Sequence, residues 1–113
     1  GPLIFFQISD KQLYTVNGDH LIGQAISACG GQNIFDELGL SVSMVSLESV
    51  LDANPDLILV VSPYEGFVSH WSDAWRELGW EGRVRYINAS LVTRPSLRML
   101  EGIKSLCKII KNR

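Results

Sequence analysis

The chain has 113 residues, of which 46% are hydrophobic and 19% charged, and ten basic against twelve acidic side chains give a net charge of −2. This length suits one domain, and the charge balance lacks the clustered basic excess of a nucleic-acid-binding protein. The longest apolar run, residues 57–61, is too short to cross a membrane, so no membrane insertion of this segment is expected. Residues 1–2 (GP) are interpreted as the remnant of a cleaved expression tag, and residues 3–113 as the domain.

Two extended segments and a helix are predicted in the first third of the chain. Residues 3–8 (LIFFQI) are apolar without helical periodicity, which is typical of a strand, and residues 13–16 (LYTV) are extended in character. Asp19 is expected to cap a helix that Gly30 and Gly31 end. Its apolar positions recur at helical spacing and are Leu21, Ile22, Ala25, Ile26 and Cys29.

The middle of the chain is expected to hold a short helix and a central strand. Residues 33–44 are predicted to be irregular. Ser46 is predicted to cap a helix over residues 47–53, which the following NP pair at residues 54–55 ends. The β-rich run of residues 57–61 (LILVV) is typical of a parallel strand that is covered on both faces.

The last third is expected to form helix, strand and helix. Residues 67–78 are predicted to be helical, with Trp71 and Trp75 on one face. The alternation in residues 83–88 (RVRYIN) predicts a strand nearer the edge of the sheet. Pro95 is placed in the first turn of a final helix. The predicted buried stripe of this helix is Leu97, Leu100, Ile103, Leu106, Cys107 and Ile110.

This order of elements predicts an α/β fold: a three-layer, Rossmann-like lobe whose mainly parallel central sheet carries helices on both faces. In such sheets ligands bind beyond the carboxyl ends of the strands, here residues 9–14, 62–64 and 88–94. Neither a phosphate-binding glycine loop nor a nucleophile elbow is present, and the two histidines lack metal-ligand spacing. The prediction is therefore a protein that is not an enzyme and has no cofactor or metal site.

The spacing of residues alone does not decide the roles of several side chains. Cys29 and Cys107 each fall on the apolar face of a predicted helix, where two buried thiols and one disulfide are equally plausible. Glu48 lies in a first helical turn, where a carboxylate gains about 0.3–1 kcal/mol from the helix dipole without any partner. Tyr14 and Arg94 are equally compatible with a packed aromatic ring and a solvated cation.

Five stretches in order resemble a known family. They are residues 14–18 (YTVNG), 28–35 (ACGGQNIF), 45–51 (VSLESVL), 54–58 (NPDLI) and 93–98 (TRPSLR). The chain resembles the C-terminal lobe of the class III periplasmic solute-binding proteins of ABC importers, and most of all the vitamin B12-binding members. The resemblance covers residues 3–113. It implies a periplasmic location, a signal peptide in the precursor, and a preceding N-lobe and linking helix.

The resemblance also implies roles for individual residues. Cys29 and Cys107 would form a disulfide, and Glu48 would dock onto arginines of the transporter permease. The implied ligand-binding set, to which Tyr64 is added because it follows the strand at residues 57–61, is Tyr14, Val42, Tyr64, Ser90 and Arg94. Val42 stands where the B12-binding members carry a tryptophan, and Ser90 where they carry an aspartate.

The expected function is therefore delivery of cobalamin or a related corrinoid to an ABC importer, with its permease and ATPase as partners. Because of the two departures, haem or a ferric siderophore stays open as the ligand. An alternative of another class is a cytosolic flavodoxin-like domain of an enzyme, in which both cysteines would be reduced. The state of the two cysteines separates the two classes.

Overall fold

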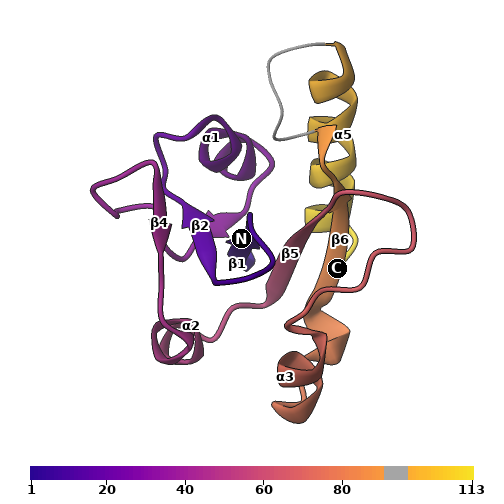
Figure 1. The fold of residues 1–113 in the computed structure, drawn as a ribbon. Coiled ribbons are helices and arrows are strands. Elements are labelled where there is room, and N and C mark those ends of the chain that lie inside the picture. The colour runs from indigo at the N-terminus through magenta and orange to yellow at the C-terminus, as the bar shows by residue number, and fades with distance from the viewer. Residues whose placement is uncertain (91–96) are drawn as a thin grey trace.

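The computed structural model describes residues 1–90 and 97–113 (Figure 1). A four-stranded sheet lies at its centre, with the strand order β3-β1-β5-β6 and every neighbouring pair parallel. Its strands are β1 (Leu3–Gln7), β3 (Gln32–Asn33), β5 (Leu57–Ser62) and β6 (Val84–Asn88). The predicted strands at residues 3–8, 57–61 and 83–88 are thus confirmed, and β6 lies at an edge of the sheet as expected.

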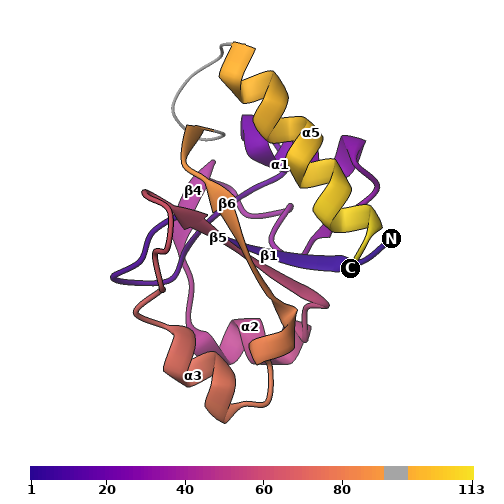
Figure 2. The same ribbon diagram turned by 90° about the vertical axis from the view of Figure 1, so that its right-hand side faces the viewer.

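Helices cover both faces of this sheet, so the predicted three-layer α/β fold is confirmed (Figure 2). α1 (Leu21–Ala28) and α5 (Leu97–Lys111) lie on one face, and α2 (Leu47–Ala53) and α3 (Ser72–Glu77) on the other. The layers follow from the central strands, whose successive side chains point to opposite faces and are apolar on both. No helix in the described part of the chain combines the length and apolarity needed to cross a bilayer.

Each face has its own core. The core under α1 and α5 includes Ile4, Phe6, Ile22, Ile26, Leu57, Leu59, Leu106 and Ile110. The core under α2 and α3 is rich in aromatic side chains and includes Phe5, Leu13, Val50, Ile58, Val60, Trp75 and Trp80. Trp75 is fully buried there and stacks on Trp80 with a ring-centroid separation of 6.0 Å.

The start of α1 differs from the prediction that Asp19 caps it. His20 is the N-cap, and its Nδ1 accepts a hydrogen bond from the Ile22 N–H at 3.0 Å. Burial lowers the pKa of His20, which favours the neutral imidazole that can accept this bond. Asn17 displaces Asp19 from the capping role, because its Oδ1 accepts from the N–H groups of both Asp19 and His20 at 3.0 Å. The helix ends with Cys29 as its C-cap, and the glycine predicted to stop it, Gly30, follows with a φ of 90°.

α2 follows the prediction at both ends. The Ser46 side chain accepts a hydrogen bond from the Ser49 N–H at 3.1 Å, and Asn54 takes a left-handed conformation with a φ of 48° at the C-cap. The segment before it was predicted to be irregular, which holds for residues 34–41 but not for its two ends. It contains β3 and β4 (Val42–Met44), and β4 pairs antiparallel with β2 (Tyr14–Val16) in a separate two-stranded sheet.

The helix predicted over residues 67–78 is shorter in the structure, where α3 spans Ser72–Glu77 and a 3₁₀ turn, η1 (Glu81–Arg83), precedes β6. The carboxylate of Asp10 accepts hydrogen bonds from the Ser69 Oγ and the His70 N–H. This contact from a distant loop holds residues 69–70 outside the helix.

The buried stripe of α5 is also rotated from the predicted one. Leu97 and Leu100 are 80% and 57% exposed, and the buried residues are Met99, Gly102, Leu106 and Ile110. The second half of the predicted stripe holds, since Ile103 and Cys107 pack against the core in part-buried positions. Pro95, the predicted helix start, lies outside the described residues.

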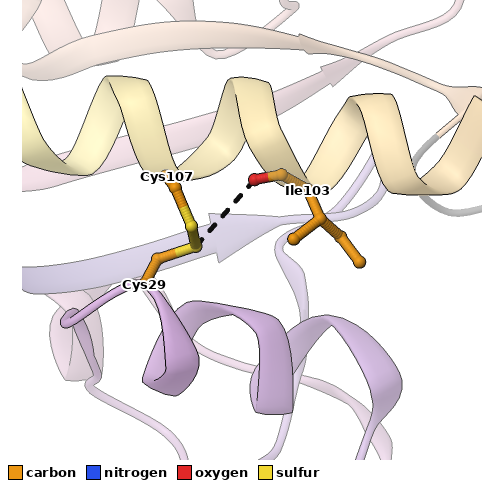
Figure 3. The surroundings of a disulfide bond; sticks show 3 residues. All are labelled: Cys29, Ile103 and Cys107. Carbon is orange, nitrogen blue, oxygen red and sulfur yellow. Dashed lines mark hydrogen bonds between the residues drawn. A yellow bond between two sulfur atoms is a disulfide. The ribbon is translucent and has the colours of Figure 1, made fainter.

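A disulfide joins the two helices of this face. Cys29 and Cys107 are bonded, with their Cα atoms 4.8 Å apart and a sequence separation of 78. Figure 3 shows the bond between the end of α1 and the side of α5, with Cys29 Sγ 3.9 Å from the carbonyl oxygen of Ile103. The disulfide implied by the resemblance is therefore present.

Candidate functional site

The candidate site is the edge of the sheet where the parallel strands end. β1, β5 and β6 all run in one direction, so the segments that follow them emerge at the same edge. The segment after β1 stays there, because the Ile8 N–H donates to the Tyr14 carbonyl at 2.9 Å and thereby fixes the start of β2. The segments after β5 and β6 carry Tyr64 and Ser90. Four of the five predicted ligand-binding residues are described, and Arg94 lies outside the described residues.

Tyr14 and Val42 come together on the two-stranded sheet. Tyr14 lies directly opposite Met44, and Val16 opposite Val42, so the four side chains share one face. Val16 is fully buried, whereas Tyr14, Val42 and Met44 are 36%, 40% and 60% exposed. We call these three exposed residues the β2–β4 patch. Sequence reasoning missed Met44, because a three-residue strand is too short for its alternation to stand out.

Tyr64 belongs to a second exposed group. It lies in the loop after β5, is 65% exposed, and meets the ring of Phe67 edge-on at 5.5 Å. Phe67 in turn meets Tyr86 of β6 edge-on at 6.1 Å. Residues 62–66 of this loop and residues 86–88 of β6 line an open hollow of about 350 Å³. An aromatic side chain beside a hollow at the end of a parallel sheet is a typical ligand-binding arrangement.

Ser90 follows β6 at the same edge. Its N–H donates to the Asn88 Oδ1 at 2.9 Å, and it is partly buried. The hydroxyl is neutral, so Ser90 brings no charge to this edge. Its contribution to a ligand stays a prediction.

Glu48 lies on a different element from these patches. It is exposed in the first turn of α2, the helix that begins just after β4. The Val45 N–H donates to the Leu13 carbonyl at 2.8 Å, which holds the entry to this helix against the segment before β2. The helix dipole by itself accounts for a carboxylate at this position, so a docking role stays a prediction.

Comparison with known proteins defines the class. No protein-family model matches the chain. The periplasmic haem-binding protein HutB of Vibrio cholerae matches with a TM-score of 0.74 over 96% of this chain and 47% of its own, and at 18% identity it shows the fold alone. The chain has the fold of one lobe of a periplasmic binding protein.

Within this class the chain is similar to the vitamin B12-binding proteins. That of Vibrio cholerae is 32% identical over 110 residues, which are 95% of this chain and 40% of the relative. The crystal structure of the vitamin B12-binding protein BtuF of Vibrio cholerae matches with a TM-score of 0.79 and 28% identity, over 97% of this chain and 44% of that chain. The chain spans 38 to 40% of the length of the curated relatives that it matches first.

Proposed function

We propose that residues 3–113 are the C-terminal lobe of a periplasmic solute-binding protein that captures cobalamin or a related corrinoid and delivers it to an ABC importer. The observation that carries the proposal is the β2–β4 patch. Tyr14, Val42 and Met44 are apolar, adjacent and exposed at the edge of the sheet where ligands of such folds bind. A macrocycle with a large apolar face suits an aromatic ring beside a flexible thioether.

The remaining features support a transport role in the periplasm. A disulfide is typical of oxidising compartments, and the structure contains one. The relatives in the comparison are binding proteins rather than enzymes. Under this proposal the permease and ATPase of the importer are the partners, and the cytosolic enzyme domain with two free thiols is disfavoured.

A second candidate keeps the class and changes the ligand to haem or a ferric siderophore. It is favoured by Val42 and Ser90, because a small aliphatic side chain and a neutral hydroxyl offer neither a large stacking ring nor a carboxylate to the ligand. Parallel titrations with cyanocobalamin, haemin and a ferric hydroxamate, followed by NMR, decide between the candidates. The ligand that shifts the amide signals of residues 14 and 42–44 at the lowest concentration is the preferred one.

Replacing Tyr14 with alanine tests the β2–β4 patch. We expect a roughly tenfold or greater loss of affinity for the preferred ligand, because an aromatic contact contributes about 1–2 kcal/mol and 1.4 kcal/mol is tenfold. Leu78→Ala is the matched control, because Leu78 is 39% exposed at the C-cap of α3, away from the patch. Tyr14→Ala and its control should lose comparable thermal stability, since Tyr14 and Leu78 are 36% and 39% exposed and both are therefore partly packed. Equal affinity of Tyr14→Ala and the unchanged protein would show that the patch is not the site.

Replacing Glu48 with alanine tests the docking role. We expect the variant to bind more weakly to the permease in nanodiscs, because removal of the carboxylate removes its charge-assisted hydrogen bonds to arginines of the permease. The free energy of unfolding should fall by less than about 1 kcal/mol, the scale of a helix-dipole charge. Glu77→Ala, which removes an exposed glutamate of α3, should leave permease binding unchanged. A loss of ligand affinity with permease binding intact would contradict the assignment.

A further inference from the structure

The loop after β5 carries Tyr64 without the support of a helix or strand. Residues 63–71, all of which the structure describes, run over the end of the sheet as a series of turns and bends. Three hydrogen bonds converge on the side chain of Ser69, which is 3% exposed near the end of this loop. A buried hydroxyl at such a position can hold an otherwise irregular segment in one shape.

The Ser69 hydroxyl uses its full hydrogen-bonding capacity. Its Oγ donates to the Asp10 Oδ1 at 2.7 Å and accepts from the Gln7 Nε2 at 3.1 Å and from the Trp71 N–H at 3.0 Å. A hydroxyl has one donor and two acceptor positions, so all three are occupied. Gln7 is the last residue of β1 and is 1% exposed, so Ser69 is tied to the sheet itself.

Asp10 joins the loop after β1 to the loop after β5. Besides the Ser69 hydroxyl, its carboxylate accepts the His70 N–H through both oxygens, at 3.0 and 3.1 Å. Hydrogen bonds to an ionised acceptor are roughly twice as strong as neutral ones. The two segments are 59 residues apart in sequence, and this contact holds them together at the ligand-binding edge.

A third connection leads from Ser69 to Tyr64. The Ser69 N–H donates to the Tyr86 Oη at 3.0 Å, and the Tyr86 ring meets Phe67, which meets Tyr64. The loop also closes on itself, since the Phe67 N–H donates to the Tyr64 carbonyl at 3.2 Å. The hydrogen bonds of Ser69 and the ring contact of Tyr86 therefore restrain the same short segment, residues 63–71.

We infer that Asp10 and Ser69 are positioning residues that hold residues 63–71 in one shape, so that Tyr64 and the hollow beside it are formed before any ligand arrives. A loop that is already ordered lowers the entropy cost of binding, because the ligand does not have to immobilise it. The role toward a ligand rests on the function proposed above, whereas the effect on the loop does not.

Hydrogen exchange of the ligand-free chain tests the effect on the loop. In Asp10→Ala and Ser69→Ala, the amides of residues 64–71 should exchange about tenfold faster or more, because lost buried hydrogen bonds favour local opening. The amides of β5 should exchange at the unchanged rate. Asp73→Ala is the control, since it removes an exposed aspartate two residues beyond the segment. Unchanged exchange of residues 64–71 in Asp10→Ala, whose side chain is only partly buried, would overturn the inference.

A double-mutant cycle tests whether the positioning acts through Tyr64. Cyanocobalamin binding is followed by NMR titration in the unchanged chain, Asp10→Ala, Tyr64→Ala and the double variant. We expect Asp10→Ala to weaken binding several-fold in the unchanged chain and to have no further effect once Tyr64 is alanine. Equal weakening in both backgrounds would overturn the role toward the ligand. If Tyr64→Ala binds as the unchanged chain does while exchange is faster in Asp10→Ala, Tyr64 is not a ligand contact, and the effect on the loop stands.

Discussion

Replacing Cys29 and Cys107 together with alanine is expected to lower the free energy of unfolding by about 2–5 kcal/mol, the usual loss for a native disulfide in a small domain. The bond closes a long loop, since the two cysteines have a sequence separation of 78. For a loop of this length the chain-entropy model gives a contribution on the order of 4 kcal/mol. Because the bond joins α1 to α5, its loss should loosen the packing of both helices on the sheet.

Urea unfolding followed by tryptophan fluorescence measures this loss. The double alanine variant and the unchanged protein under strong reductant should unfold at similar urea concentrations, both well below that of the oxidised protein. A smaller difference of about 1 kcal/mol between them is expected, since Cys29 is 5% exposed and its side chain packs in the core. Mass spectrometry after alkylation supplies the direct check. Two alkylated cysteines in the untreated protein would show that the bond does not form.

The second large effect concerns the affinity of the 113-residue chain by itself. We expect it to bind cyanocobalamin several decades more weakly than a vitamin B12-binding relative of full length. The chain corresponds to 44% of the BtuF chain. In the 113-residue chain, the β2–β4 patch and the loop of residues 63–71 form an open surface. A ligand on one open face makes fewer contacts but still loses its translational and rotational freedom, and each 1.4 kcal/mol lost is tenfold in affinity.

Calorimetry and NMR titration together cover the range of affinities that this comparison needs. The full-length relative should give a measurable heat at micromolar ligand, whereas the 113-residue chain should respond in the NMR titration at millimolar ligand. The Tyr14→Ala variant of the chain should respond still more weakly, which separates weak binding at the patch from non-specific association. Tight, stoichiometric binding by the chain alone would contradict the view that it supplies only part of a ligand site.

Local signals were enough to predict much of the fold. The β-rich run at residues 57–61 became the central strand β5, and Ser46 and Asn54 begin and end α2 as expected. These features depend on neighbours within a few residues, namely a side chain that caps its own helix or an apolar run that any covering layer would bury. Such signals survive folding because the tertiary structure does not have to supply their partners.

Elements that depend on distant partners could not be predicted in the same way. β4 exists because β2, which lies much earlier in the chain, pairs with it in the register that places Tyr14 opposite Met44. The predicted helix over residues 67–78 loses its first part because Asp10 binds residues 69–70. The buried stripe of α5 includes Met99 and Gly102 instead of Leu97 and Leu100, because the orientation of the helix on the sheet, and not the hydrophobicity of its residues alone, decides which side chains are buried.

The residues of the candidate site also fall into those that the sequence could indicate and those that depend on tertiary contacts. The sequence by itself determined that an α/β lobe would place Tyr64 beyond the end of one of its parallel strands. Its resemblance to a family singled out Tyr14, Val42, Ser90 and the pairing of the two cysteines. Only the tertiary structure decided that Tyr14 and Val42 share one exposed face with Met44, and that Asp10 and Ser69 hold the loop of Tyr64. The physical reason is the sequence distance between the interacting residues. A buried strand or the caps of α2 follow from short segments, whereas a shared face and a buried hydroxyl with three partners exist only after strands and loops far apart in the chain have packed together.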